Sequence, residues 1–322
     1  MKRRIVSSLV VIVAMLAACE KTRTPQPKGS GTLSPAELAL FKYLPKNAAV
    51  YFAGDYSKLQ DFMKSGLGRL ASMVTDKMSP ALTALETCLA TPRNMKSAMA
   101  INVANKSFDN RIVIDGLTIA EVAKCGQQAQ IKTTVDPDGR YVSIEVPLTT
   151  GTFDFAYYAI ADHTLYVHQT IVSGEKSLHT CTRTDCEADL AKLGHDSAAD
   201  DADFNALASK ADRSKTAWFV GAGAGTPLAE AITELYGSLD ATSGIAIDVT
   251  VQMQRPGDAE KLERGVTQLR KMADQLPESF KAVVAALKFD RAGDRVHAAL
   301  ALTDAQVKSV SDQLGSMLGA LH

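Results

Sequence analysis

A similarity between the two halves of the chain constrains its fold more than any other feature of the sequence. Residues 49–54 (AVYFAG) resemble residues 217–222 (AWFVGA). Each segment is a short apolar run with aromatic residues that contains a glycine near its end, which is typical of a strand that leads into a turn. A helical pattern follows each segment, over 58–89 in the first half and over 227–239 in the second. The two halves therefore predict related units of strand and helix.

The likeness continues in the same order further along the chain. Residues 97–103 (SAMAINV) resemble residues 243–249 (SGIAIDV), and a second helical pattern follows each of them. An Asp-Gly or Gly-Asp step then separates two apolar runs in each half, which is a strong signal of a β-hairpin. The helices predicted here are 119–128 and 258–275, and the hairpins are 135–142 and 289–296.

This order of elements predicts an α+β fold with two related lobes, each a mostly antiparallel sheet covered by helices, from a diverged internal duplication. The two lobes can share one continuous sheet. The first half has an additional hairpin over 153–161 and 164–169. A helix over 303–321, with Thr303 as its N-cap, ends the second half, and Ser34-Pro35-Ala36-Glu37 has the pattern of another N-cap and first turn.

The boundaries between these parts follow the composition. Residues 173–202 are rich in Ser, Thr, Asp and Gly and predict a linker with some ordered content between a first lobe, 35–172, and a second lobe, 203–322. Residues 20–34 contain Pro, Gly, Ser, Thr and charges without an apolar period. Such a segment buries too little apolar surface to offset the entropy of ordering, so we expect a flexible tether over 19–34.

The N-terminus has the pattern of a secretory signal peptide. A basic start, Lys2-Arg3-Arg4, is followed by residues 5–18, which are apolar apart from two serines. This apolar run is too short for a membrane span, which needs about 20 residues, and it fits the apolar core of a signal peptide over 1–18. It leads into Leu16-Ala17-Ala18-Cys19, which resembles the lipobox of bacterial lipoproteins.

The lipobox resemblance implies a chemical role for Cys19. In bacterial lipoproteins a diacylglycerol is attached to this cysteine, a peptidase cleaves just before it, and its new amino group is acylated, with palmitate among the expected chains. Two or three acyl chains hold a protein durably, whereas one chain binds reversibly. We therefore expect lipidation at Cys19 and a protein that is anchored to a membrane without spanning it. The alternative is a plain signal peptide with a cysteine at this position by chance.

The expected location is the bacterial cell envelope. Glu20 follows the cysteine at a position where aspartate signals inner-membrane retention in enteric-type lipoproteins, so the resemblance favours the outer membrane. Removal of residues 1–18 removes three positive charges and no negative charge, which changes the formal net charge from −1 to −4. Nucleic-acid binding would favour a basic face. The expected partners are the membrane, through the lipid, and another envelope protein, with no nucleic acid.

Beyond the tether, the chain resembles a group of envelope lipoproteins in which paired α+β units open with a Leu-Pro-x-Asn/Asp-Ala motif. The motif here is Leu44-Pro45-Lys46-Asn47-Ala48. The resemblance extends over most of the mature chain. It implies architecture alone, because the motif is structural and the group supplies no activity.

Four cysteines remain besides Cys19, and an exported protein occupies a compartment in which disulfides persist. Proximity in the sequence favours the pairs Cys88–Cys125 and Cys181–Cys186, although four cysteines allow three connectivities. A zinc site is the alternative, but the spacing of the four cysteines includes no CxxC pair. We expect disulfides and no metal or other cofactor.

Two further segments resemble ligand-binding loops without matching them. Residues 221–226 (GAGAGT) follow a predicted strand, but they lack the last glycine of a dinucleotide loop and the lysine of a P-loop. Residues 194–203 (GHDSAADDAD) hold four aspartates without the alternate spacing and final glutamate of a calcium loop. A strand–helix turn and a solvated acidic loop are the simpler interpretations.

The histidines are scattered through the chain. His163 and His168 lie in the additional hairpin on opposite faces, His179 and His195 lie in the linker, and His297 lies in a strand. None belongs to an HExxH pattern, and no GxSxG element is present. We therefore predict no catalytic residue, while a triad assembled only in space stays open.

These observations predict a membrane-anchored envelope lipoprotein with a non-enzymatic binding or scaffold role. The first alternative is a carrier of a hydrophobic ligand or lipid, because apolar residues recur at helical spacing from Phe62 to Leu85. Packing of the protein core explains the same stripe. The second alternative is a hydrolase whose site has no recognisable motif.

Overall fold

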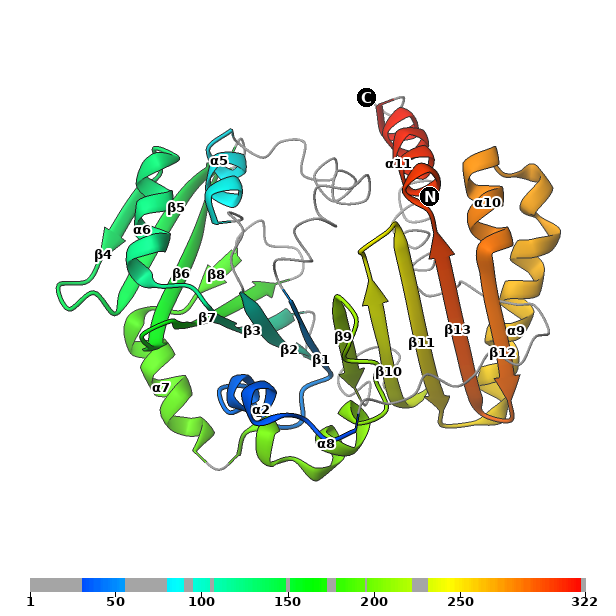
Figure 1. Cartoon of the computed structure of the whole chain (residues 1–322), viewed down its shortest axis with the longest axis horizontal. Helices are drawn as coiled ribbons and strands as arrows, with labels where there is room; N and C mark the ends of the chain where they lie inside the picture. The colour runs from blue at the N-terminus through cyan, green and yellow to red at the C-terminus, as the bar shows by residue number, and fades with distance from the viewer. Residues whose placement is uncertain are drawn as a thin grey trace.

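The computed structural model of the chain describes residues 31–55, 80–89, 95–104, 107–148, 151–172, 178–194, 196–221 and 231–319. The fold is α+β, as predicted, with helices packed on the two faces of one large antiparallel sheet (Figure 1). The thirteen described strands follow the order β12-β13-β11-β10-β9-β1-β2-β3-β7-β6-β5-β4, and β8 pairs with β7.

The strands divide between the two halves of the chain. The first half supplies β1 (Val50–Asp55), β2 (Lys96–Ala104), β3 (Ser107–Asp115), β4 (Lys132–Val135), β5 (Tyr141–Leu148), β6 (Gly151–Ala161), β7 (Thr164–Val172) and β8 (Leu178–Thr180). The second half supplies β9 (Ala217–Gly221), β10 (Ile232–Asp240), β11 (Ile245–Met253), β12 (Leu287–Ala292) and β13 (Arg295–Leu302).

The two halves meet at the antiparallel pair of β1 and β9 in the middle of the sheet (Figure 1). Phe52 lies opposite Phe219, and the centroids of their rings are 5.7 Å apart. These are the first two segments that the sequence comparison matched. Because they pair with each other, the halves share one continuous sheet.

The described helices pack on two opposite faces. The face that we call the α7 face carries α2 (Pro35–Phe41), α7 (Arg183–Leu193) and α8 (Ala202–Ala208), with the short helix η1 (Ala198–Asp200). The opposite face, the α9 face, carries α5 (Pro80–Leu89), α6 (Ile119–Gln128), α9 (Pro256–Lys271), η2 (Ala273–Gln275), α10 (Glu278–Ala286) and α11 (Asp304–Gly319). Among the described helices, none is long and apolar enough to cross a membrane.

Successive strand residues contribute to different cores because side chains alternate between the faces. The core of the α7 face joins both halves, and in it Phe41 of α2 and Phe204 of α8 pack with Trp218 of β9. The α9 face has a separate core in each half, one around Val122 of α6 and one around Val266 of α9. Burial of each large apolar side chain contributes about 1.5–3 kcal/mol.

Reciprocal caps fix the starts of several helices. In each cap a hydroxyl accepts the N–H three residues later, and the side chain there accepts the N–H of the capping residue. The pairs are Ser34 with Glu37, Thr118 with Glu121, Thr182 with Asp185 and Thr303 with Gln306. The predicted helix starts at Ser34 and Thr303 are confirmed, as are the helices predicted over 119–128 and 258–275 to within a few residues.

The predicted hairpins are also confirmed, namely β4–β5, β6–β7 and β12–β13. Gly139 and Gly293 turn the first and last of these with φ angles of +69° and +65°. Glycine adopts these left-handed values without the steric cost that other residues meet. The Asp-Gly and Gly-Asp steps were therefore reliable signals.

The helix predicted over 227–239 is wrong within the described residues, where Ile232–Asp240 forms strand β10. Its side chains alternate, with Leu235 and Leu239 on the α9 face and Tyr236 on the α7 face. Gly237 has a reason to be glycine, because a Cβ there would lie 2.5 Å from the ring of Phe219. Pairing with β9 on one side and β11 on the other selected the strand over the apparent helical spacing.

The predicted match between residues 97–103 and 243–249 needs correction. Residues 97–103 lie in β2, beside β1, whereas 243–249 lie mainly in β11, which is separated from β9 by β10. The counterparts by position are β2 with β10 and β3 with β11, and the hairpin β6–β7 is inserted between β3 and β5. Strand β3 itself was missed because Asp109 and Arg111 interrupt its apolar pattern. The duplication stays a prediction.

The segment predicted as a linker, 173–202, is largely part of the first lobe. Strand β8 pairs with β7, α7 packs on the sheet, and Cys181 and Cys186 are buried. Its polar composition reflects helix caps and ion pairs with the lobe. The interpretation of this segment as a spacer is corrected.

Disulfides join Cys88 to Cys125 and Cys181 to Cys186, the pairs that proximity favoured. The first connects α5 with α6, and the second connects the segment after β8 with the first turn of α7. Cys19 and the lipobox lie outside the described residues. The part of the apolar stripe before residue 80 also lies outside them, whereas Leu85, at the end of the stripe, is buried against the α6 core.

Candidate binding site

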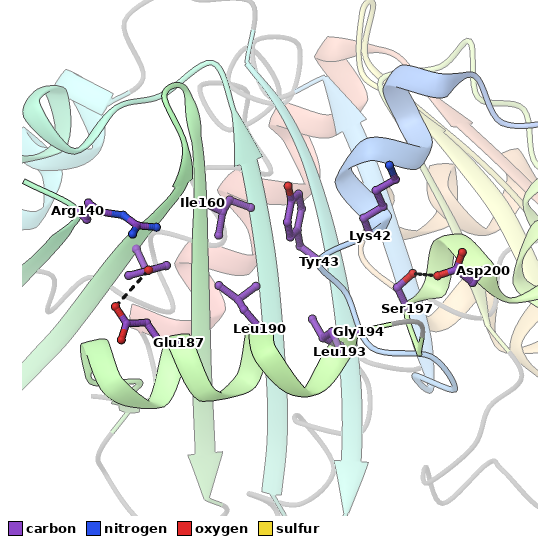
Figure 2. A pocket seen from close by; sticks show the side chains of 11 residues that line it. Lys42, Tyr43, Arg140, Ile160, Glu187, Leu190, Leu193, Gly194, Ser197 and Asp200 are labelled. Carbon is purple, nitrogen blue, oxygen red and sulfur yellow. Dashed lines mark hydrogen bonds between the residues drawn. The ribbon is translucent and has the colours of Figure 1, made fainter.

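A cleft of about 660 Å³ opens on the α7 face, between the end of α2, the length of α7 and strand β6 (Figure 2). We call it the α2–α7 cleft. Its volume lies within the range of small-molecule sites in proteins. The residues that line it are Lys42, Tyr43, Arg140, Tyr158, Ile160, Glu187, Leu190, Leu193, Gly194, Ser197 and Asp200.

The α7 wall of the cleft is fixed by ion pairs at the start of the helix. Arg183 binds Asp138 with both ends of its guanidinium, at 2.9 and 2.7 Å. It also donates to Asp136 at 2.7 Å and to Glu187 at 2.9 Å. These carboxylates, Asp138 first, raise the pKa of Arg183. The pairs with Asp136 and Asp138 hold the first turn of α7 on the β4–β5 turn, and the Cys181–Cys186 disulfide joins the same turn of α7 to the segment after β8.

The opposite wall explains the Leu44–Ala48 motif. Leu44 is fully buried, and its carbonyl accepts the N–H of Ala198 at 2.9 Å. Asn47 adopts a left-handed φ of 59°, which asparagine tolerates better than most residues. The hydroxyl of Tyr51 donates to the carbonyl of Pro45 at 2.8 Å and accepts the N–H of Ala48 at 2.9 Å. The motif therefore fixes the chain after α2 against the segment after α7.

One end of the cleft holds a cation and an anion that are kept apart. The guanidinium of Arg140 lies 5.1 Å from the ring centroid of Tyr158 and donates to the carbonyl of Ala159 at 3.3 Å. The hydroxyl of Tyr158 donates to Oε1 of Glu187 at 3.2 Å. Burial raises the pKa of Tyr158, and the hydrogen bond from Arg183 lowers that of Glu187, so Tyr158 stays neutral and Glu187 ionised near neutral pH.

The middle and the other end of the cleft differ in character. Ile160 of β6 and Leu190 of α7 face each other across its middle, with Tyr43 beside them (Figure 2). At the far end Lys42 is exposed, and Asp200 accepts the hydroxyl of Ser197 at 2.6 Å. The cleft therefore has an apolar and aromatic centre between two charged ends.

Beneath α7, His168 connects the helix to the sheet. Its Nδ1 lies 2.5 Å from Asp189 of α7, and its Nε2 lies 3.0 Å from Asp109 of β3. Burial opposes the ionisation of Asp109, but contact with His168 and the charge of Arg111 outweigh it and lower the pKa of Asp109. Tyr166 donates to Asp189 at 3.4 Å. Both ring nitrogens of His168 thus face carboxylates.

His297 lies in the same cross-strand row of the α7 face as His168. The row follows the strand registers through His168, Arg111, Ala100, Tyr51, Val220, Tyr236, Thr250, His297 and Asp290. The Nε2 of His297 lies 3.0 Å from Asp248, and its Nδ1 lies 4.0 Å from Asp290. The hydrogen bond with Asp248 raises the pKa of His297.

The other predicted candidates have ordinary structural places where they are described. Within residues 194–203, Asp201 is buried and caps α8, so the expectation of a solvated acidic loop is wrong at this residue. His163 turns the β6–β7 hairpin, and its carbonyl accepts two N–H groups. His195 and residues 222–226 lie outside the described part of the chain. Among the described residues, no group of three or more His, Cys, Asp or Glu could hold a metal ion.

Sequence reasoning did not single out the residues of the cleft. Arg140, Tyr158 and Glu187 come from a turn, a strand and a helix, and only the fold brings them together. One signal was available in the segment taken as a linker. Thr182-Arg183-Thr184-Asp185 has the spacing of a capping box with Asp at its last position, which indicates a helix rather than a spacer.

Comparisons with known proteins give a limited picture. No protein-family description and no curated protein matches the chain. Solved structures of TP0453 align with it: crystal form I has a TM-score of 0.45 at 11% identity, over 85% of this chain and 96% of that one. Crystal form III gives 0.45 at 9% identity, over 86% and 97%. At a TM-score under 0.5, this likeness assigns no function to the chain.

Proposed function

We propose that this protein is a lipid-anchored component of the bacterial envelope, held through Cys19, with a binding rather than a catalytic role at the α2–α7 cleft. The lipobox resemblance supports the anchor. The cleft supports the binding role, because it combines an apolar centre with a few convergent polar groups, the usual composition of ligand sites. That combination is the observation on which the proposal depends.

The contacts of His168 and His297 support a structural rather than a catalytic role for these two side chains. His168 contacts Asp109 and Asp189, and His297 contacts Asp248, with Asp290 near its other nitrogen. A histidine that serves as general base needs one ring nitrogen within reach of a nucleophile or water. We therefore assign both side chains to the attachment of neighbouring elements.

The two predicted binding roles differ in the size of what is bound. A protein partner engages about 800 Å² of surface on each side. The cleft volume of about 660 Å³ suits a small molecule instead. This observation favours the second candidate, a carrier or receptor for a ligand with an apolar part, over a scaffold that holds another protein at this site.

The anchor is tested by replacing the cysteine. The Cys19→Ala variant should be exported but should no longer sediment with membranes, because the lipid is its only proposed attachment. The Cys186→Ser variant, which loses a different cysteine, should still sediment. Retention of Cys19→Ala in membranes after a high-salt wash would contradict the anchor.

The binding role is tested by photocrosslinking in intact cells. A benzophenone amino acid at position 43, which lines the cleft, should form an adduct of defined mass. The same probe at position 272, which is 44% exposed on the second lobe, is the control. If position 43 gives no adduct beyond that at position 272, the cleft is empty in the cell and the binding role is lost.

A further inference from the structure

Two charged groups at the Arg140 end of the cleft, Arg140 and Glu187, are exposed and accessible to a ligand. Both hydrogen bonds received by Glu187, from Arg183 and from Tyr158, go to Oε1. The described contacts leave Oε2 without a donor. Arg140 contacts only a carbonyl and an aromatic face through its side chain, and within the described residues it has no carboxylate at ion-pair distance. A cation and an anion thus flank Tyr158 without an ion-pair contact between them, although the charge of Arg140 helps to lower the pKa of Glu187.

The separation of these two charges is built into the structure. Arg183 and Tyr158 both donate to Oε1 of Glu187, and the ring of Tyr158 holds the guanidinium of Arg140 over its face. Arg183 serves three carboxylates, so this end of the cleft is not positive overall. A ligand group that is purely anionic would meet Glu187, and one that is purely cationic would meet Arg140.

We infer that the α2–α7 cleft binds a single-chain zwitterionic amphiphile, with its cationic group at Glu187, its anionic group at Arg140 and its chain along the apolar centre. Ile160 and Leu190 would contact the chain. The inference rests on the proposed binding role of the cleft and names the class of ligand.

The position of the cleft agrees with a ligand that comes from a membrane. The described chain begins at Gly31, twelve residues after Cys19, and α2 follows at once. Twelve extended residues span at most about 40 Å, so Gly31, which precedes α2, lies within about 40 Å of a lipid anchor on Cys19. Arg213 fixes this exit point, since it donates to the carbonyls of Gly31 and Thr32 at 2.7 and 2.8 Å.

A peptide ligand is less suited to this cleft. Peptides commonly bind by adding a strand to a sheet edge, where backbone groups are unpaired. The cleft lies over β6, whose two neighbours β5 and β7 already pair with it. A free amino acid carries the same pair of charges but lacks a chain long enough to use the apolar centre.

The test uses four ligands with the same eight-carbon chain: octylphosphocholine, octyl phosphate, octyltrimethylammonium and octanamide. Titration calorimetry is done below their micellar concentrations on the full lipidated chain in nanodiscs, with empty nanodiscs as the blank. We expect octylphosphocholine to bind about tenfold more tightly than either singly charged ligand, because each open charge then gains a charge-assisted contact.

Two variants should shift the selectivity in opposite directions. Arg140→Gln should weaken octylphosphocholine about tenfold and make the cationic ligand preferred over the anionic one. Glu187→Gln should also weaken octylphosphocholine but should make the anionic ligand preferred over the cationic one. The matched controls are Arg291→Gln and Glu263→Gln, an ion pair of 2.7 Å on the second lobe, which should change no affinity. Unchanged thermal midpoints show that the variants are folded.

Several outcomes would overturn the inference. Equal affinity for all four head groups would show that Arg140 and Glu187 do not select the charge of the ligand. Equal competition by free leucine would show that the chain is not bound, and tighter binding of an acidic or apolar peptide would assign the cleft to peptides. If the eight-carbon ligands fail while position 43 still gives its adduct in cells, the ligand class is wrong and the binding role survives. If both fail, both are wrong.

Discussion

His168 and His297 lie in one row on one face of the sheet, yet their surroundings differ. His168 is covered by α7, which supplies Asp189 to one of its ring nitrogens. His297 finds its carboxylates within the sheet, on β11 and β12. The apolar cluster of this face reaches from the first lobe only as far as Tyr236 of β10. The first lobe therefore has helices on both faces, whereas in the second lobe the described helices over β11, β12 and β13 lie on the α9 face and only α8, over β9 and β10, packs on the α7 face.

This difference shows where the candidate site comes from. One row of side chains crosses the sheet in both halves, and the α2–α7 cleft lies at the end of the described α7 face where α7 packs over the sheet. The helix belongs to the segment between the halves, and its attachment depends on ion pairs, one histidine and a disulfide. Removing these attachments should lower the stability of the first lobe and leave the stability of the second lobe nearly unchanged.

The largest effect is expected from the disulfide of the first lobe. Cys88–Cys125 closes a loop with a sequence separation of 37, and the second lobe has no cysteine. In the chain-entropy description such a crosslink stabilises a protein by about 3–4 kcal/mol. The double variant Cys88→Ser/Cys125→Ser should lose that amount of unfolding free energy in a denaturant titration.

Hydrogen exchange gives the matched control for this prediction. Protection should fall in α5 and α6, while α9 and α11 of the second lobe keep their protection. A loss below about 1 kcal/mol would contradict the crosslink as a main support of the first lobe. Peptide mapping without reduction that joins Cys88 or Cys125 to Cys181 or Cys186 would contradict the pairing itself.

A smaller effect is expected from the carboxylates that contact the two histidines. Asp189→Ala removes the contact of α7 with His168 and leaves Arg111 and Tyr166 without their acceptor on the helix. Loss of a hydrogen-bonded partner in a largely buried network costs about 1–3 kcal/mol. Asp248→Ala should cost less, about 0.5–1 kcal/mol, because Asp248 is more exposed and Asp290 stays near His297.

The local readout separates these two variants. Asp189→Ala should speed hydrogen exchange throughout α7 and weaken ligand binding in the cleft, while Asp248→Ala should do neither. Equal losses of stability in both variants, with α7 still protected, would mean that the helix is held without His168. The contrast between the histidine under α7 and the histidine that contacts carboxylates within the sheet would then have no energetic meaning.

The sequence predicted local features of the fold better than the relations between segments. Caps at Ser34 and Thr303 and the turns at Gly139 and Gly293 were found, because each depends on a few neighbouring residues with a strong preference. The apparent helix over 227–239 failed because its residues fit two periods, and the pairing of β10 with β9 and β11 selected the strand. The sequence allowed one continuous sheet, and the pairing of β1 with β9 forms it.

The candidate site could not be predicted in the same way. Arg140, Tyr158 and Glu187 are separated in the sequence, and their proximity depends on where α7 lies. The polar composition of 173–202 was taken as evidence of a linker, whereas its acidic and hydroxyl residues serve caps and ion pairs. A capping box inside a polar segment is the signal that deserved more weight.

The smallest predicted effect is a difference in pH dependence between the histidine of the second lobe and the aspartate of the first. The fold raises the pKa of His297 above its ordinary value of 6.5, chiefly through Asp248. The stabilisation by protonated His297 is therefore complete below about pH 6.5 and is lost as the pH rises through the raised pKa. The pKa of Asp109 is lowered from 3.8, so its stabilisation is complete above that value and is lost as the pH falls through the lowered pKa.

Unfolding free energies measured from pH 3 to pH 9 should separate the two contributions. His297→Gln should remove part of the decline above about pH 6.5 and leave the acid limb unchanged, while Asp109→Asn should flatten the acid limb alone. Asp248→Asn should mimic His297→Gln, because Asp248 is the main cause of the raised pKa. If His297→Gln instead lowers stability equally at every pH, the side chain acts through packing, and its ionisation makes no contribution to the second lobe.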